Sequence, residues 1–210
     1  TMTLGNLVAL QQTNPVRLLA YSSISQAGFI IAPLAASGIT GNYQDGIFAS
    51  VTYLIIYAFM NIGAFLSVHL FTNFTKSDNF YEWGGIAKHS PLAGVLTTVF
   101  FFSLAGIPPL GGWFAKFVVF RSLLSTGEII GISLAIVGAI NAVIALVYYA
   151  RISKVIWMDE LKNPEEEKSF EFQSPLKVVG ALTVLITFVA GIFPGIFSYL
   201  GEVSSIFFGN

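Results

Sequence analysis

Two adjacent prolines and three glycines interrupt the apolar stretch Leu104-Ala105-Gly106-Ile107-Pro108-Pro109-Leu110-Gly111-Gly112-Trp113-Phe114-Ala115-Lys116-Phe117. Proline lacks a backbone N–H and clashes with the preceding turn, so a helix must break or bend here. In a bilayer, such a break is tolerated only where protein packs around it or where it lines a polar cavity. We therefore predict a broken helix at Gly106, Pro108, Pro109, Gly111 and Gly112, with the rest of the chain packed around it.

The composition indicates a membrane protein. Of the 210 residues, 55% are hydrophobic and only 10% are charged, whereas soluble domains carry about 25% charged residues. A net charge of −1 provides no basic face for nucleic acid, and the absence of cysteine excludes disulfides and thiolate metal sites. The chain begins Thr1-Met2-Thr3-Leu4 without a basic leader, so we expect no signal peptide and a start inside a longer protein.

The expected fold is an all-α polytopic membrane protein with about five transmembrane helices in a single domain over residues 1–210. The helices are predicted at about 18–37, 47–70, 91–124, 129–156 and 178–200. The third would be about 50 Å long, which exceeds the roughly 30 Å of a bilayer core. Its excess length, with Pro108 and Pro109 inside it, predicts two half-helices.

Basic residues are unequally distributed between the two ends of these helices. If the helices alternate in direction, eight positive residues fall on one side: Arg17, Lys76, Lys88, Arg151, Lys154, Lys162, Lys168 and Lys177. Only Arg121 falls on the other side. Because cytoplasmic loops are enriched in lysine and arginine, we expect the first side to face the cytoplasm or its equivalent. The C-terminus would then lie on the outer side.

Lys116 is the main candidate for chemistry. It lies about 12 Å before the end of its predicted helix, and burying it charged costs about 2.5–3.5 kcal/mol. One interpretation is a lysine that snorkels to the interface. The other is a protonatable group in a wet cavity, where free backbone groups at the break hold water. The neighbouring break favours the second interpretation.

Other polar side chains form a possible polar path through the membrane: Tyr21, Ser22, Ser25, Gln26, Asn61, His69 and Asn141. Ser22, Ser25 and Gln26 share one helix face by their spacing. These three side chains either join neighbouring helices by hydrogen bonds or line a water path, and the same two roles are open to Asn61 and Asn141. His69 is either a residue at the membrane interface or a proton-exchange group. The second role is open because imidazole titrates near neutral pH.

Motifs of metal sites, phosphate loops and activated nucleophiles are absent from the sequence. We expect no metal or cofactor site in this chain. The pattern is that of a conduit for protons or cations rather than a self-contained redox enzyme.

Four segments resemble the antiporter-like subunits of respiratory complex I. They are 17–29 (RLLAYSSISQAGF), 103–117 (SLAGIPPLGGWFAKF), 53–65 (YLIIYAFMNIGAF) and 148–152 (YYARI). The last two are most similar to the subunit N branch of the family and its photosynthetic counterpart.

The resemblance implies two inverted five-helix repeats, each with a discontinuous helix, of which this chain would be the C-terminal half. It implies a proton-translocating subunit of NADH-quinone oxidoreductase, with Lys116 as the last member of a row of protonatable groups. NADH, FMN, iron–sulfur clusters and quinone would be bound by other subunits. The partners would be other membrane subunits, the missing N-terminal half and the lipid bilayer. The location would be an energy-transducing membrane: the bacterial plasma membrane or, alternatively, an organelle inner or thylakoid membrane.

Two positions depart from the family pattern. Many members carry Lys-Arg where this chain has Val16-Arg17, and histidine where it has Gln26. Glutamine cannot titrate, so a relay at that point would pass through water, and Lys116 remains the titratable group in the interior. Two alternatives stay open at this point: a subunit of a multi-subunit cation/proton antiporter, or a membrane scaffold without a transport role.

Overall fold

The computed structural model describes residues 1–160 and 174–208, and the side chains of 1–160 and 178–207. Over these ranges the secondary structure is helical, without strands. The elements are α1 (Met2–Leu10), α2 (Pro15–Thr40), α3 (Tyr43–Thr75), η1 (Phe80–Trp83), α4 (Ile86–His89), α5 (Pro91–Ala105), α6 (Gly111–Ser125), α7 (Ile129–Met158), α8 (Ser174–Ile192) and α9 (Gly195–Phe208). The basic residues Lys162 and Lys168 lie outside the described residues.

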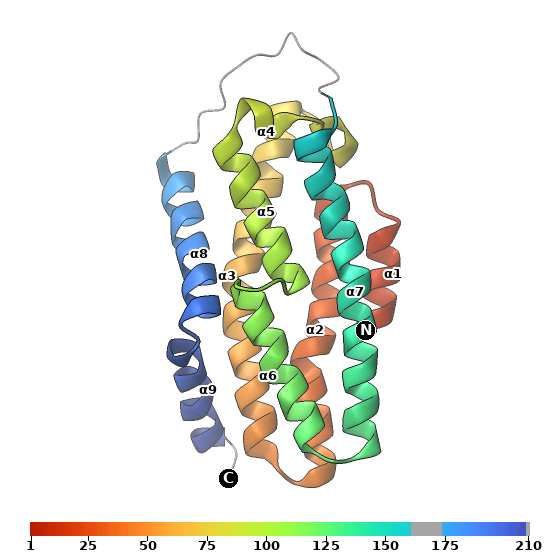
Figure 1. Ribbon diagram of the computed structural model, residues 1–210, viewed down its shortest axis with the longest axis vertical. Coiled ribbons are helices and arrows are strands. Elements are labelled where there is room, and N and C mark those ends of the chain that lie inside the picture. The colour runs from red at the N-terminus through yellow and green to blue at the C-terminus, as the bar shows by residue number, and fades with distance from the viewer. Residues whose placement is uncertain (161–173, 209–210) are drawn as a thin grey trace.

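The long helices run side by side along the long axis of the molecule (Figure 1). The α2–α3 turn, the α6–α7 turn and the C-terminus lie at what we call the lower end, as drawn in Figure 1. The helix α4 and the start of α8 lie at the upper end. Consecutive long helices therefore alternate in direction, as the distribution of positive residues requires.

The helix ends follow from local capping groups. Helix α2 begins where the Asn14 side chain accepts a hydrogen bond from the Arg17 amide at 3.0 Å, with Pro15 in the first turn. It ends at Gly41, whose φ of 75° lies in the left-handed region. The predicted range 18–37 covered only the apolar part of α2, and 47–70 only that of α3, because both helices continue through polar residues to their caps.

Three described helices, α2, α3 and α7, are long and apolar enough to cross a membrane, and the bent pair α8–α9 makes a fourth if it is one span. Helices α5 and α6 have 15 residues each, or about 22 Å each, which is too short for a single crossing. Figure 1 shows them end to end. The expected third helix is therefore two half-helices.

The last predicted helix, 178–200, is wrong as a continuous element. Helix α8 ends at Ile192 and α9 begins at Gly195, with a bend of 82° between them. Pro194 lies at this bend and has no N–H to continue the helical ladder. The same residue type therefore breaks both the third and the last predicted helix.

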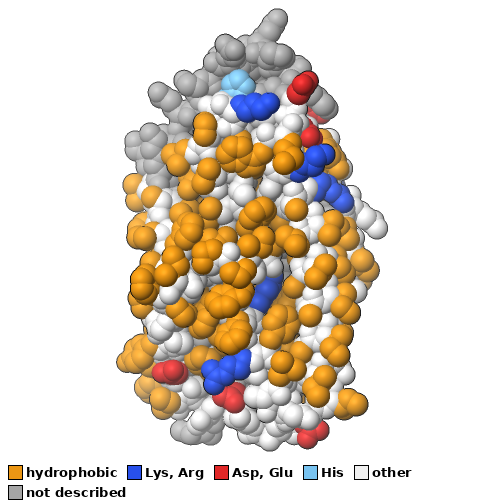
Figure 2. All heavy atoms as spheres, viewed as in Figure 1, with side chains coloured by type: hydrophobic (Ala, Val, Ile, Leu, Met, Phe, Trp, Pro, Cys, Tyr) orange, Lys and Arg blue, Asp and Glu red, His pale blue; other side chains and the backbone are white. Residues whose placement is uncertain are grey.

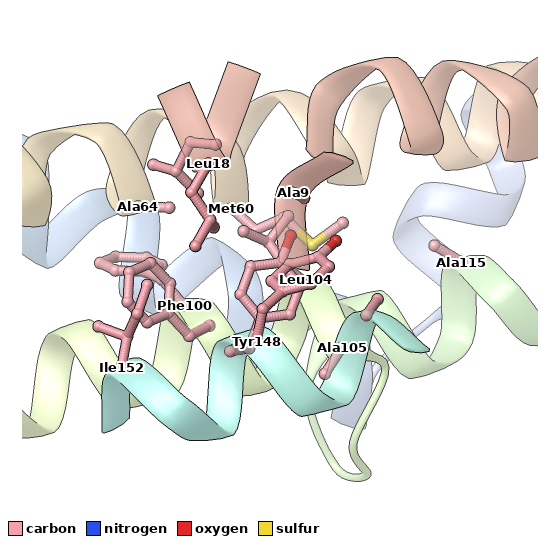
Figure 3. Packing of buried hydrophobic residues seen from close by; sticks show 14 of the residues in the cluster. Ala9, Leu18, Met60, Ala64, Phe100, Leu104, Ala105, Ala115, Tyr148 and Ile152 are labelled. Atoms are coloured by element: carbon pink, nitrogen blue, oxygen red, sulfur yellow. The ribbon is translucent and has the colours of Figure 1, made fainter. Parts of the chain in front are cut away.

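The core joins all the long helices around α5 and α6. Met60 of α3, Phe100 and Leu104 of α5, and Tyr148 and Ile152 of α7 belong to one cluster of buried residues (Figure 3). On the outside, apolar side chains cover the middle of the face in Figure 2, where one Lys or Arg side chain is visible between them, and the other charged side chains gather toward the two ends. This distribution is the one that a bilayer requires of a membrane-spanning bundle.

Close packing at the break depends on Gly112. A Cβ on this residue would overlap the carbonyl oxygen of Ser103 and lie 3.2 Å from the Met60 sulfur. The start of α6 therefore lies directly against the end of α5, and only glycine fits at this contact.

We predict that Gly112→Ala lowers the free energy of unfolding by about 2 kcal/mol or more, because overpacking against backbone is not relieved by rotamer changes. Thermal unfolding of the detergent-solubilised protein measures the effect. The matched control is Gly38→Ala on α2, where a Cβ meets nothing within 4 Å. Equal stability of the two variants would contradict the proposed contact.

Candidate functional site: a buried lysine at the end of a broken helix

The end of α5 presents two carbonyl groups to the interior. Gly106 adopts a φ of 95°, and its amide donates to the carbonyls of Phe102 at 3.0 Å and Ser103 at 2.9 Å. The chain then leaves the helix, so the carbonyls of Leu104 and Ala105 have no partner in a following turn. A side chain from elsewhere must satisfy them.

Lys116 supplies that partner. Its Nζ donates to the carbonyl oxygens of Leu104 at 2.8 Å and Ala105 at 2.7 Å, and the residue is only 5% exposed. Long side chains on a helix point back toward its N-terminus, which is why a residue in the second turn of α6 reaches the end of α5. A cation is also favoured there by the negative end of the α5 dipole. The broken backbone and the buried charge therefore stabilise each other.

Gln26 and Tyr53 extend this site into α2 and α3. The Gln26 Nε2 donates to the Leu104 carbonyl oxygen at 3.1 Å, so this oxygen accepts from both Gln26 and Lys116. The Tyr53 hydroxyl donates to Gln26 Oε1 at 2.5 Å. Both side chains are buried. Four helices, α2, α3, α5 and α6, thus meet at one polar point.

A second buried polar network joins α1, α2 and α7. The Asn6 side chain donates to the carbonyl oxygen of Asn141 at 2.9 Å and to its Oδ1 at 3.0 Å, and accepts from the Tyr148 hydroxyl at 2.9 Å. The rings of Tyr148 and Tyr149 lie 4.5 Å apart. The Tyr149 hydroxyl is hydrogen-bonded to Ser22. Because Ser22 is one helical turn from Gln26, the two networks are neighbours along α2.

The predicted polar path is only partly assembled. Ser22, Gln26 and Asn141 are buried in these networks, whereas Tyr21 and Asn61 are half-buried. The backbone of Ser25 packs so closely against Gly5 of α1 that a Cβ on Gly5 would lie 2.8 Å from the Ser25 nitrogen. His69 is exposed and its Nε2 is 2.9 Å from the Asn73 side-chain nitrogen, one turn along α3.

Four buried residues of the networks were missed in the sequence: Asn6, Tyr53, Tyr148 and Tyr149. Three of them are tyrosines inside apolar helices, where a buried hydroxyl needs a hydrogen-bond partner. Asn6 is a polar amide in an otherwise apolar segment. A buried amide also needs a hydrogen-bond partner, so Asn6 indicates a partner on another helix. Both signals were present in the sequence, but the partners lie on other helices, 27 residues away for Tyr53 and more than 120 residues away for the other three.

No group of three or more histidine, cysteine, aspartate or glutamate side chains that could hold a metal ion occurs in the described part of the chain. The site consists of one lysine, backbone carbonyls, amides and phenol groups. Such a set can hold and release a proton, and it can order water.

A broken helix whose end carbonyls bind a buried ionisable side chain, within a bundle of apolar spans, resembles the discontinuous helices found in membrane transporters. The family model described as "NADH:quinone oxidoreductase/Mrp antiporter, TM" matches residues 1–144. The chain belongs to this family.

Individual relatives agree with this assignment. The chain is 41% identical over 208 residues to "NADH-quinone oxidoreductase subunit N 2" of Rhizobium meliloti, covering 98% of this chain and 41% of that protein. It is 37% identical over 194 residues to "NADH-quinone oxidoreductase subunit N" of Moorella thermoacetica, covering 92% of this chain and 39% of that protein. The chain thus spans about two fifths of the length of these relatives.

Solved structures show the same fold at low sequence identity. A chain of respiratory complex I from Thermus thermophilus superposes with a TM-score of 0.80 at 19% identity, over 100% of this chain and 43% of that one. A chain of the Mrp complex from Dietzia sp. DQ12-45-1b superposes with a TM-score of 0.82 at 20% identity, over 98% of this chain and 45% of that one.

We predict that Asn6→Leu lowers the free energy of unfolding by about 1–3 kcal/mol, because it leaves the buried groups of Asn141 and Tyr148 unpaired. The double variant Asn6→Leu/Asn141→Leu should cost less than the sum of the single changes. Unfolding of the detergent-solubilised protein measures all three, with exposed Asn73→Leu as the control. Strict additivity would show that the Asn6–Asn141 contact does not form.

Proposed function

We propose that this chain is part of the proton-translocating membrane subunit of NADH-quinone oxidoreductase. The observation that carries the proposal is Lys116, buried at mid-height of the bundle and held by the end carbonyls of a broken helix. Electron transfer takes place in other subunits and drives proton movement through this lysine. The relatives named as subunit N support this assignment.

The environment of Lys116 suits both of its protonation states. The two carbonyl oxygens and the dipole of α5 stabilise the ammonium. Free backbone groups at a break also hold water, which can take up the proton and return it.

The orientation follows from the basic residues. Arg17, Lys76, Lys88, Arg151 and Lys154 belong to the start of α2, the end of α3, α4 and the end of α7. These parts lie toward the upper end in Figure 1. We infer that the upper end faces the cytoplasm or its equivalent and that the C-terminus faces the outer side. The membrane is an energy-transducing one, in a bacterium the plasma membrane.

The chain works only as part of an assembly. Its partners are the rest of the same subunit, the other membrane subunits of complex I, and the surrounding lipid. We propose that NADH, FMN, the iron–sulfur clusters and quinone are bound elsewhere in the complex. The predicted lack of a redox cofactor in this chain agrees with a role restricted to proton transfer.

A second candidate, a subunit of a multi-subunit cation/proton antiporter, rests on the shared fold with the Mrp complex. Sodium-dependent proton flux without an NADH-oxidising partner would favour this candidate. The subunit N relatives, at 37% and 41% identity, favour complex I.

We predict that Lys116→Ala in the assembled complex lowers proton pumping severalfold relative to quinone reduction, because it removes the only ionisable side chain at the break. Proteoliposomes with a pH-sensitive dye report pumping, and NADH oxidation reports electron transfer. The control is Lys154→Ala, whose side chain is 65% exposed and pairs with Asp159 at 3.8 Å on the surface. Normal pumping by a fully assembled Lys116→Ala complex would refute the proposed function.

A further inference from the structure

The surroundings of Lys116 differ between the upper and lower directions of the bundle. On the side of α2 that leads to the upper end lie Gln26 and then Ser22, both hydrogen-bonded and part of the polar networks. On the side that leads to the lower end lies Phe29, whose ring centroid is 5.4 Å from the Lys116 Nζ. The lysine therefore has polar neighbours in one direction and an aromatic ring in the other.

Phe29 belongs to a tightly packed layer. Its ring is 1% exposed, stacks on Tyr53 with centroids 6.1 Å apart, and meets Phe120 edge-on at 6.5 Å. Gly138 of α7 closes the layer, since a Cβ there would lie 3.3 Å from Phe29 and 3.1 Å from Phe120. We call Phe29, Phe120 and Gly138 the aromatic layer. It joins α2, α6 and α7 and contains no polar side chain.

Polar cavities lie below the aromatic layer. One of about 240 Å³ is bordered by the exposed charged residues Asp45, Arg121 and Glu202, and a smaller one of about 70 Å³ by Ser37, Asp45 and Ser122 among others. Both contain residues of α6 and α3. Along α6, Ser122 lies about 9 Å from Lys116. The cavities thus approach the lysine from the lower end but are separated from it by about two helical turns.

The separating stretch of α3 holds further buried polar groups near the level of Phe29, among them Ser50. Gln26 meets Tyr53 across the antiparallel helices α2 and α3, and Ser37 packs against Gly46. Ser50 therefore lies at a height between these two contacts. Its hydroxyl is buried and has no hydrogen-bond partner among the described residues. Water that enters from the cavities would find a hydrogen-bonding group at that height.

We propose that Phe29 is the gate between Lys116 and the lower polar cavities. The inference rests on the proposed function. With the ring in place, Lys116 exchanges protons only with the polar networks on its upper side. When the ring turns away, water reaches Nζ, one N–H bond breaks, and the proton passes to that water while the electron pair remains on nitrogen. The proton then leaves past Ser122 and the carboxylates of Asp45 and Glu202.

The charge of Lys116 itself acts on the gate. A cation over the face of an aromatic ring is attracted to it, so the ammonium holds Phe29 in the closed position. Loss of the proton removes this attraction. The ring is therefore held most firmly when the lysine is charged, which prevents uncoupled loss of the proton.

The test is passive proton leak through the assembled complex in proteoliposomes, with an imposed pH gradient and no NADH. Phe29→Ala should raise the leak severalfold over the wild type, and the double variant Phe29→Ala/Lys116→Ala should return it to the wild-type level. Phe100→Ala is the matched control, because Phe100 is equally buried but packs against Gly63 in the upper half. It should not raise the leak.

Two results would overturn the gate. The first is an assembled Phe29→Ala complex whose proton leak equals that of the wild type. The second is an increased proton leak that persists in the double variant, which would indicate a water path independent of the lysine. If Phe29→Ala does not assemble, Phe29→Val, which keeps an apolar side chain, must show an intermediate leak for the gate to stand. The proposed function fails separately, through normal pumping by Lys116→Ala alone.

Discussion

The hydrogen bonds from the Lys116 ammonium to the carbonyls of Leu104 and Ala105 are the interaction on which the rest of the structure depends. A helix that ends in the middle of an apolar bundle leaves carbonyl groups unpaired, and an unpaired charged lysine in the same place would cost still more. Because the ammonium donates to the carbonyl oxygens, both groups are paired. The arrangement needs the close approach of α5 and α6, which Gly112 permits.

Around Lys116 the helices contribute polar groups toward the upper end of the bundle and aromatic rings toward the lower end. Gln26 binds the same helix end and accepts a hydrogen bond from Tyr53, and the network of Asn6 and Tyr149 lies next to them. Toward the lower end, the aromatic layer with Phe29 replaces these polar groups, and charged cavities begin only beyond it. This asymmetry fits the proposed directional path, in which Lys116 exchanges protons with one side at a time.

The sequence was sufficient to predict the membrane class, the broken helix and the buried lysine, because proline, glycine and lysine in an apolar run have few physical alternatives. It was insufficient for the bend at Pro194, because the apolar run continues on both sides of this residue, and for the true ends of α2 and α3. The partners of Asn6 and Tyr53 could not be predicted either. Hydrogen bonds between distant helices depend on register and rotation about each axis, and local spacing does not determine these.

The most direct measurement is a high-resolution cryo-electron microscopy map of the assembled complex in lipid, examined at Lys116. We predict density for the side chain directed into the bundle, with Nζ within hydrogen-bond distance of the Leu104 and Ala105 carbonyl oxygens. A lysine side chain directed outward to lipid or to the headgroup region, with the end of α5 bound to another group, would contradict it.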